Sequence, residues 1–548
     1  MAEYSEYPPK RQKRTAANTA AVRFCDTLPY MFLITVAPLS RRRGIDTLSY
    51  YSAGEYPPGA VVHAPIQTRA VEAVVLDCAP ITGSKSSIRN ATYALQKLPT
   101  QSVHGGIPPH IIDACTATAT AHGLPAAIVL HALLPKTLLA YFSEHETPQP
   151  KPRATRSPNP QLFQGLLPAR ISLYRTLVRE AFAQRSSVII VAPYTEHAVR
   201  IYEALAHDAP THTHLLHTQL TPKKQLAALT ALHTATHPVL AIVTPRFAAL
   251  PRADIKHYLL EHEHSELYHT HRAPHIDLKE YVAHLAHAQH ATLLYADLPL
   301  SIARIYERRR ELCDEITSGN QRITFPAPTT LIDQKGEKRP PKQPFMTLSA
   351  HLRAEIASYT HAGKRVLLYV TRRGLGTTTV CADCGTTVTC LTCGAGVVLH
   401  KAEPYNHFLC HSCGTHRSAA ERCKHCDSWR LETLGIGAER VEEEVRAVFP
   451  DTPLFVTTGD TATTPAQIRK TLAAFTDTPG AVLLTTAPAI RALKAHVPLV
   501  GVVSMDTLFS LPVWNVHEHI ARTLLLLGTT ASEQLTIQTR HPNNTLLE

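Results

Sequence analysis

The chain has 548 residues, enough for roughly three or four domains, and its 44% hydrophobic content is ordinary for a protein with folded cores. Its formal net charge of +11 suits a polyanionic partner such as nucleic acid, although a basic solubilising surface would carry the same charge. The sequence has no apolar run near the ~20 residues of a membrane helix, and its first apolar run, residues 31–37, follows no basic segment of the signal type, so we expect a cytoplasmic protein with reduced thiols.

The N-terminal part of the chain changes character twice. Residues 1–27 are polar with a basic cluster at residues 10–14, which predicts a flexible basic arm. Residues 28–80 contain β-branched and aromatic runs separated by turn signals, and they predict a small β-domain. Helical patterns follow from residue 88 to 142, so we assign residues 81–146 to a small helical domain.

Alternating strands and helices begin after a linker. A proline-rich stretch within residues 147–160 predicts a semi-rigid connection. Residues 161–333 then alternate apolar, β-branched runs with helical segments, which predicts a parallel sheet flanked by helices. The expected strands are residues 187–192, 239–243, 258–260 and 291–294, and the expected helices include residues 173–184 and 223–233.

A second α/β domain follows a charged, proline-rich linker at residues 334–345. Residues 346–380 and 430–548 repeat the alternation, and residues 381–429 between them hold most of the cysteines. We therefore expect residues 381–429 to form a module inserted into the second α/β domain. The expected helices are residues 348–361 and 441–448, and the expected strands are residues 365–370, 454–457, 481–485 and 499–503.

The strongest motif is a set of four Cys-x-x-Cys pairs in this module. Each pair presents two thiolates to one ion, and two pairs complete the tetrahedral sulfur site that Zn²⁺ accepts. Gly385, Gly394 and Gly414 directly follow three of the pairs, where positive φ lets backbone amides point at the sulfurs. We therefore expect two structural zinc sites. The expected ligands are Cys381, Cys384, Cys390, Cys393, Cys410, Cys413, Cys423 and Cys426.

Disulfides and iron–sulfur clusters are the competing interpretations of these cysteines. Regular Cys-x-x-Cys pairs without a secretory signal favour a metal over disulfides, and the tight cysteine run of bacterial iron–sulfur clusters is missing. The four pairs could combine consecutively or in a nested order. Consecutive pairing would join the first two pairs through only five residues, 385–389, so the nested order is easier to build.

The order of these parts resembles one known family. The run Arg372-Arg373-Gly374, the eight cysteines, residues 434–444 and Phe449-Pro450 together resemble primosomal protein N′ (PriA), the superfamily 2 helicase family of bacterial replication restart. The resemblance implies an N-terminal 3′-end-binding β-domain, a winged-helix-like helical domain and two RecA-like helicase lobes, formed by the two α/β domains. It also implies nested zinc pairing. Because the chain stops soon after residues 536–539, we expect it to lack the family's C-terminal domain.

The resemblance further locates the segments with which this family binds and cleaves ATP. The Gly-rich phosphate loop would fall at residues 165–172, where Arg170 stands for the second glycine and Ile171 for the phosphate-binding lysine. The Asp-Glu-Glu-His box aligns with residues 261–264, so that His262 replaces the glutamate that would polarise the attacking water.

Two more segments of this machinery are altered. Residues 295–299 stand where Gly-Ser-Ala-Thr-Pro would couple hydrolysis to DNA, and residues 520–534 lack the arginine-rich motif that supplies an arginine finger. In the N-terminal domain, Leu48-Ser49-Tyr50 replaces the Phe-Asp-Tyr segment of the pocket for a 3′ end. Because the four segments of the ATPase machinery at residues 165–172, 261–264, 295–299 and 520–534 are all altered, we expect ATP turnover to be lost or very slow.

A histidine-rich stretch after the strand at residues 258–260 could bind a transition metal, because imidazole and carboxylate groups are competent ligands. In a chain with 33 histidines, a solvated loop is the interpretation that we prefer. The stretch contains Glu261, His262, Glu263, His264, His269, His271 and His275.

Three hypotheses follow. The first is a PriA-like, two-zinc protein that binds forked or single-stranded DNA in replication restart without hydrolysing ATP, with primosome proteins and single-strand-binding protein as partners. The second is an ATP-dependent 3′-to-5′ DNA helicase with an atypical nucleotide site. The third is a zinc-stabilised scaffold that binds only proteins. We assign no catalytic or nucleotide-binding residue.

Overall fold

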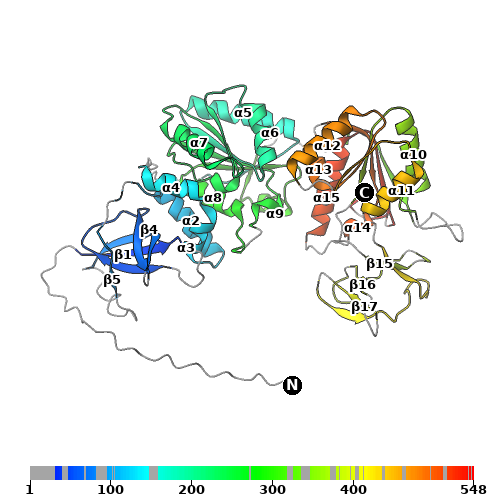
Figure 1. The fold of residues 1–548 in the computed structure, drawn as a ribbon, viewed down its shortest axis with the longest axis horizontal. Helices are drawn as coiled ribbons and strands as arrows, with labels where there is room; N and C mark the ends of the chain where they lie inside the picture. The colour runs from blue at the N-terminus through cyan, green and yellow to red at the C-terminus, as the bar shows by residue number, and fades with distance from the viewer. Residues whose placement is uncertain are drawn as a thin grey trace, which may run out of the picture.

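The computed structural model places an N-terminal sheet, a group of helices and two parallel α/β sheets in chain order, with the cysteine-rich module beside the second of these sheets (Figure 1). The predicted N-terminal arm, most of both linkers, Arg372-Arg373-Gly374 and Gly385 lie outside the described residues. The structure describes every residue except 1–30, 40–46, 67–68, 82–94, 101–102, 104, 147–157, 271–272, 317–324, 335–345, 371–377, 382, 385, 395, 401–405, 411–412, 435–437, 459–463, 494, 510–514, 541, 545 and 548.

The N-terminal sheet confirms the predicted β-domain. Its described strands are β1 (Phe32–Pro38), β2 (Leu48–Ser52), β3 (Val61–Ile66), β4 (Arg69–Pro80) and β5 (Gln96–Lys97). They lie in the order β3-β4-β1-β2-β5, antiparallel except for the pair β2 and β5. We expected helix from residue 88 onward, and this expectation is wrong at β5. The exposed polar residues of β5 pair with β2 and so provide partners for backbone groups at the edge of that strand.

Among the described residues, three helices connect this sheet to the rest of the chain: α2 (Pro109–Ala121), α3 (Ala126–Leu133) and α4 (Lys136–Glu144). Each begins after a proline with extended ψ, which suits the residue before a helix. Their buried side chains belong to the same hydrophobic core as one face of the first parallel sheet. None of the described helices alone is long and apolar enough to cross a membrane; α3 and α4 satisfy that criterion only as a pair, and they are bent by 101° at the break between them.

The first parallel sheet has the α/β arrangement predicted for residues 161–333, except that residues 329–333 at the end of that range form a strand of the second parallel sheet. Its described strands are β6 (Gln161–Gln164), β7 (Ser187–Val191), β8 (Thr213–Leu216), β9 (Leu240–Val243), β10 (Ile255–Glu261), β11 (Thr292–Asp297) and β12 (Asp314–Glu315). They are parallel, in the order β12-β6-β11-β10-β7-β9-β8. All residues of β7 and β9 are buried, as expected for a sheet covered on both faces.

Helices cover both faces of this sheet (Figure 1). They are α5 (Leu167–Ala183), α6 (Thr195–Leu205), α7 (Pro222–Thr234), α8 (Leu278–Ala288) and α9 (Ile302–Arg309), with short 3₁₀ turns η2 (Pro245–Phe247) and η3 (Glu266–Tyr268). Val188 and Ile190 of β7 pack with α5 and α6 on one face, whereas Ile189 and Val191 pack with α7 and α8 on the other. This alternation is the two-residue period of a strand.

The second parallel sheet repeats the arrangement. Its described strands are β13 (Thr329–Asp333), β14 (Val366–Tyr369), β20 (Leu454–Thr457), β21 (Val482–Thr485), β22 (Val497–Val502) and β23 (Ala531–Thr539), in the order β13-β23-β22-β14-β21-β20. The flanking helices are α10 (Ala350–His361), α11 (Ala438–Val448), α12 (Pro465–Asp477), α13 (Ala487–Ala492), α14 (Asp506–Phe509) and α15 (Val516–Thr530). The α10 and α11 helices cover one face, and α12 and α15 cover the other.

The cysteine-rich module is inserted between β14 and α11, as predicted. Its strands β15 (Thr378–Cys381) and β19 (Leu431–Leu434) pair antiparallel where the module leaves and rejoins the second lobe. A small sheet of β16 (Val398–His400), β17 (His407–Leu409) and β18 (His416–Ser418) lies further along the insertion. The predicted multidomain α/β fold class, with an inserted cysteine module, is thereby confirmed.

Candidate functional site

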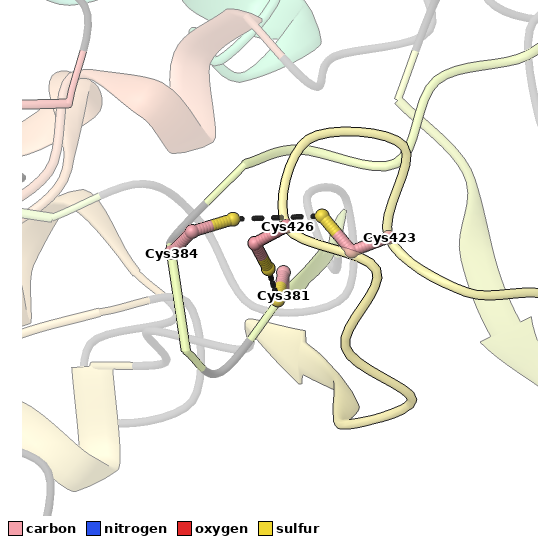
Figure 2. A group of neighbouring side chains, drawn as sticks. All are labelled: Cys381, Cys384, Cys423 and Cys426. Carbon is pink, nitrogen blue, oxygen red and sulfur yellow. Dashed lines mark hydrogen bonds between the residues drawn. The ribbon is translucent and has the colours of Figure 1, made fainter.

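The eight predicted cysteine ligands come together in two groups of four. Cys381 and Cys384 meet Cys423 and Cys426 in the outer group, which joins the two ends of the module (Figure 2). The inner group combines the pair Cys390 and Cys393 with the pair Cys410 and Cys413. The arrangement is therefore nested, and consecutive pairing is excluded.

The spacing of the sulfurs fits one metal ion in each group. The Sγ atoms of Cys384 and Cys423 lie 3.5 Å apart, and those of Cys390 and Cys413 lie 3.6 Å apart. A disulfide would join its sulfurs at about 2.05 Å, whereas four sulfurs bound to one Zn²⁺ at about 2.3 Å would be separated by about 3.8 Å. The donor set therefore suits two ions such as zinc, which would act as structural cross-links.

Local backbone geometry explains how each pair presents its thiols. Gly394 and Gly414 have φ values of 76° and 74°, as predicted, and their amides donate to the carbonyls of Cys390 and Cys410. Asp427 follows the fourth pair with φ of 57° and makes the equivalent bond to Cys423. Aspartate and asparagine tolerate this left-handed conformation better than most residues, so Asp427 takes the place that glycine has in the other pairs.

The predicted phosphate loop is not a loop. In the first lobe β6 ends at Gln164 and α5 begins at Leu167, so only Gly165 and Leu166 separate strand from helix. A phosphate cradle needs a longer glycine-rich turn whose amides face the ligand. Pro168 lies in the first turn of α5, where its missing N–H costs no helical hydrogen bond. The helix therefore starts before residue 173, where we expected it to begin.

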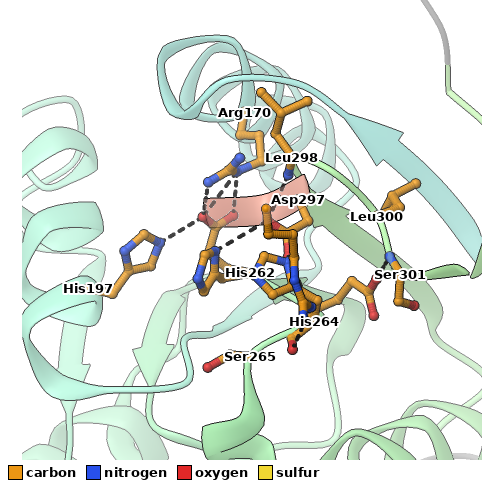
Figure 3. Close-up of polar contacts among 12 residues, drawn as sticks. Arg170, His197, His262, His264, Ser265, Asp297, Leu298, Leu300 and Ser301 are labelled. Atoms are coloured by element: carbon orange, nitrogen blue, oxygen red, sulfur yellow. Dashed lines mark hydrogen bonds and ion pairs between the residues drawn. The ribbon is translucent and has the colours of Figure 1, made fainter. Parts of the chain in front are cut away.

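Arg170 and Glu261 form a buried ion pair at the carboxyl edge of the first sheet. The Nε and Nη2 atoms of Arg170 donate to the carboxylate at 3.0 and 2.7 Å, and Nη1 donates to the Gly165 carbonyl at 2.6 Å. Glu261 is fully buried, and the Arg170 side chain is 6% exposed. His197 from α6 reaches the same carboxylate at 2.7 Å (Figure 3). Tyr174 of α5 donates to it as well.

This network fixes the charge of Glu261. Burial alone would raise the pKa of the carboxyl group, but Arg170 and His197 together lower it to about 2. The same carboxylate raises the pKa of Arg170 despite the desolvation of the guanidinium. Both groups are therefore charged at neutral pH, and each satisfies the other.

The histidine-rich stretch is not a solvated loop where it follows β10. His262 and His264 are 17% and 10% exposed, and their Nδ1 atoms approach the two oxygens of Asp297 at the end of β11 (Figure 3). Burial would raise the pKa of Asp297, but the two imidazoles hold it well below its usual range. His269 and His275 are exposed and lie outside this cluster, and His271 is outside the described residues.

The second lobe touches this edge through α15. Arg522 donates from Nη1 to the His264 carbonyl at 3.3 Å and pairs with Glu518 one turn earlier at 3.4 Å. Arg522 lies within the segment that lacks the family's arginine-rich motif. Sequence reasoning did not identify Arg522, His197 or Tyr174, because nothing in their local sequence signals a partner in a distant segment.

No family model matches the chain. Curated relatives named replication restart protein PriA align with part of it. The protein of Bacillus subtilis is 25% identical over 264 residues, or 47% of this chain and 32% of the relative. The proteins of Rickettsia typhi and Haemophilus influenzae are 30% and 25% identical over 31% and 36% of this chain. The aligned part thus spans about a third or less of each of these relatives, 32%, 26% and 28%.

Similar solved structures are helicases of low sequence identity. The helicase MrfA bound to DNA covers 70% of this chain with a TM-score of 0.41, and RecG bound to a three-way DNA junction covers 80% with a TM-score of 0.38, each at 10% identity. The curated matches come from several distinct bacteria and carry the same name. The resemblance to the replication restart protein PriA is therefore confirmed, as a sequence similarity over part of the chain.

Proposed function

We propose that this chain is a PriA-like protein that acts in replication restart by binding forked or single-stranded DNA and that does not hydrolyse ATP. The observation that carries the proposal is the buried pair of Arg170 and Glu261. The sequence similarity to PriA supports the process, and the net charge of +11 supports a nucleic-acid partner.

The Arg170–Glu261 pair occupies the carboxyl edge of the first sheet, where the resemblance places the groups that bind a nucleotide and its metal. Glu261 stands where the resemblance places the acid that holds the metal of a nucleotide, but Arg170, His197 and Tyr174 already engage both of its oxygens. Ile171 offers no charge to a phosphate, and the two-residue connection between β6 and α5 offers no row of free amides. A triphosphate would have to break a buried ion pair to bind here, which is costly.

Two further parts of the proposal concern cofactors and partners. We propose that the two cysteine groups bind zinc, because full sulfur coordination is typical of structural zinc sites. The proposed partners are DNA, primosome proteins and single-strand-binding protein. The domain boundaries expected from the sequence are also part of this proposal, with residues 381–429 as the zinc-binding module, except that residues 329–333 belong to the second α/β domain.

The decisive test is phosphate release by the purified, zinc-loaded chain with forked DNA. We expect no DNA-stimulated release and no binding of a fluorescent ATP analogue, in wild type or in Glu261→Gln. Release that DNA stimulates and that Glu261→Gln abolishes would overturn the proposal in favour of an active helicase. Release that persists unchanged in Glu261→Gln would come from a contaminating enzyme.

A further inference from the structure

We propose that His262, His264 and Asp297 form a third metal site, which takes a divalent transition ion through nitrogen and oxygen ligands. This site lies beside the Arg170–Glu261 pair but shares no ligand with it. It does not depend on whether the chain hydrolyses ATP, and it differs in chemistry from the two cysteine groups.

Side chains from the ends of two neighbouring strands converge at this point. His262 and His264 directly follow β10, and Asp297 is the last residue of β11, which pairs with β10 in parallel. One ligand atom from each of the three residues lies within 4.8 Å of the other two. Figure 3 shows both imidazoles next to Asp297. Two histidines and one carboxylate are the ligand set of many Fe²⁺ and Zn²⁺ sites, which keep positions open for other ligands.

The ligands are held in place before an ion arrives. The backbone N–H groups of Leu298 and His264 donate to the two oxygens of Asp297 at 2.7 and 3.1 Å, so the carboxylate cannot swing away. His262 has φ of 56°, a conformation that is uncommon for a residue with a side chain. The rings of His262 and His264 have centroids 4.4 Å apart. Such prior positioning is what a metal site requires of its protein ligands.

A cluster of hydrogen-bonded ion pairs is the alternative to a metal site. In that case both Nδ1 atoms must carry protons and share one carboxylate. Among the described residues, Nδ1 of His264 and Nε2 of His262 are buried without a hydrogen-bond partner, although Nδ1 of His264 lies against Asp297, which a purely structural cluster would not favour. A metal ion would instead bind the deprotonated Nδ1 of each ring, and so would give Nδ1 of His264 the partner that it lacks.

The ligand chemistry selects the class of ion. Imidazole suits Zn²⁺, Fe²⁺, Co²⁺ and Ni²⁺, whereas Mg²⁺ prefers oxygen ligands and retains its water. The site is therefore distinct from the magnesium site that accompanies a nucleotide. Because the His264 carbonyl accepts the hydrogen bond from Arg522, an ion would also stabilise the segment against which α15 rests.

Cobalt titration of the zinc-loaded full-length chain tests this site. We expect wild type to retain two zinc ions and to bind one additional Co²⁺, with visible absorption but without sulfur-to-cobalt charge-transfer bands. His262→Gln and His264→Gln should retain both zinc ions and lose the additional Co²⁺. His269→Gln, which changes an exposed histidine of the same stretch, should bind Co²⁺ like wild type.

Several outcomes would overturn the site. Wild type that binds no additional Co²⁺ would show an ion-pair cluster only, and equal binding by all variants would show adventitious surface histidines. Charge-transfer bands would show exchange at the cysteines instead. If a histidine variant loses its zinc or its circular dichroism, Asp297→Asn takes its place, because an amide oxygen can still accept from Leu298. Zn²⁺ should displace Co²⁺ from wild type at one equivalent, and excess Mg²⁺ should not.

Discussion

At the scale of single residues, Arg170 determines what the carboxyl edge of the first sheet can bind. Its guanidinium occupies the space beside Glu261 and donates to the carboxylate and to the Gly165 carbonyl. A buried pair of this kind adds little stability over an apolar equivalent, but removal of one partner leaves an uncompensated charge. The pair is therefore weak as a source of stability and strong as a barrier to change at either position.

Arg170→Met should destabilise the chain by about 3–5 kcal/mol, because Glu261 would remain buried without its guanidinium partner. Glu261→Gln should also destabilise it, whereas the double variant should recover part of the loss, which urea unfolding followed by circular dichroism will measure. The control is Arg175→Met on the same helix. Arg175 pairs with Asp208, and the two side chains are 41% and 42% exposed, so this substitution should reduce stability by about 1 kcal/mol or less. Additive losses in the double variant would contradict a direct coupling.

The Glu261 carboxyl also predicts a dependence on pH. Its folded pKa of about 2 lies below the unfolded value of about 4.5, so its stabilisation is present above that unfolded value and is lost as the pH falls toward 2. The loss should reach about 3 kcal/mol. The difference in unfolding temperature between wild type and Glu261→Gln should therefore become smaller as the pH falls from 5 to 3. A constant difference in unfolding temperature would mean that the Glu261 carboxyl has the same pKa in the folded and unfolded states.

At the scale of elements, the strands were predictable and some of the connections were not. Runs such as residues 187–192 and 239–243 are continuously apolar because β7 and β9 are buried on both faces, which is a strong local signal. The two-residue strand β5 has no such pattern, since its pairing with β2 fixes it. The start of α5 was missed because residues 165–172 were aligned with a phosphate loop.

The sites divide in the same way. The eight cysteines were predictable because spacing within each pair is local, and the short connection at residues 385–389 favoured the nested order that the structure has. Arg170 and Glu261 are 91 positions apart, and His262 follows β10 whereas Asp297 is the last residue of β11. Only the order of the strands in the sheet brings these residues together, so no local sequence pattern could predict their contacts.

The cysteine-rich module gives a prediction at this scale. Cys410→Ser should lower the zinc content from two ions to one, because Cys410 is fully buried in the inner group, and the parallel sheets should persist. Cys78→Ser, which changes a thiol in the N-terminal sheet, is the control and should keep both ions. Elemental analysis measures the zinc, and circular dichroism reports the sheets. Unchanged zinc in Cys410→Ser would refute the inner site.

At the scale of the whole molecule, two lobes, an N-terminal sheet and the module lie on one basic chain with a net charge of +11. Contact between the lobes includes Arg522 at the His264 carbonyl, so the first sheet and α15 meet at the edge where Arg170 is buried. Binding of DNA by such a chain would depend mainly on contacts with phosphates, which carry little sequence information.

Binding of a forked oligonucleotide should therefore fall steeply with salt. A protein that contacts roughly six or more phosphates loses about 10³-fold in affinity between about 50 and 200 mM salt. Fluorescence anisotropy with a labelled fork measures the slope, and a duplex of equal length serves as the control for fork preference. Absence of any binding at low salt would leave a scaffold that recognises only proteins.

The pairing of β15 with β19 has a consequence for how the module could be gained or removed. The two strands bring the points of departure and return side by side, with Thr378 opposite Leu434. Excision of the intervening segment would leave a gap that a tight hairpin turn could close, so the six-stranded sheet around β14 should tolerate the deletion. The module is therefore connected to the second lobe through two neighbouring strands, β15 and β19.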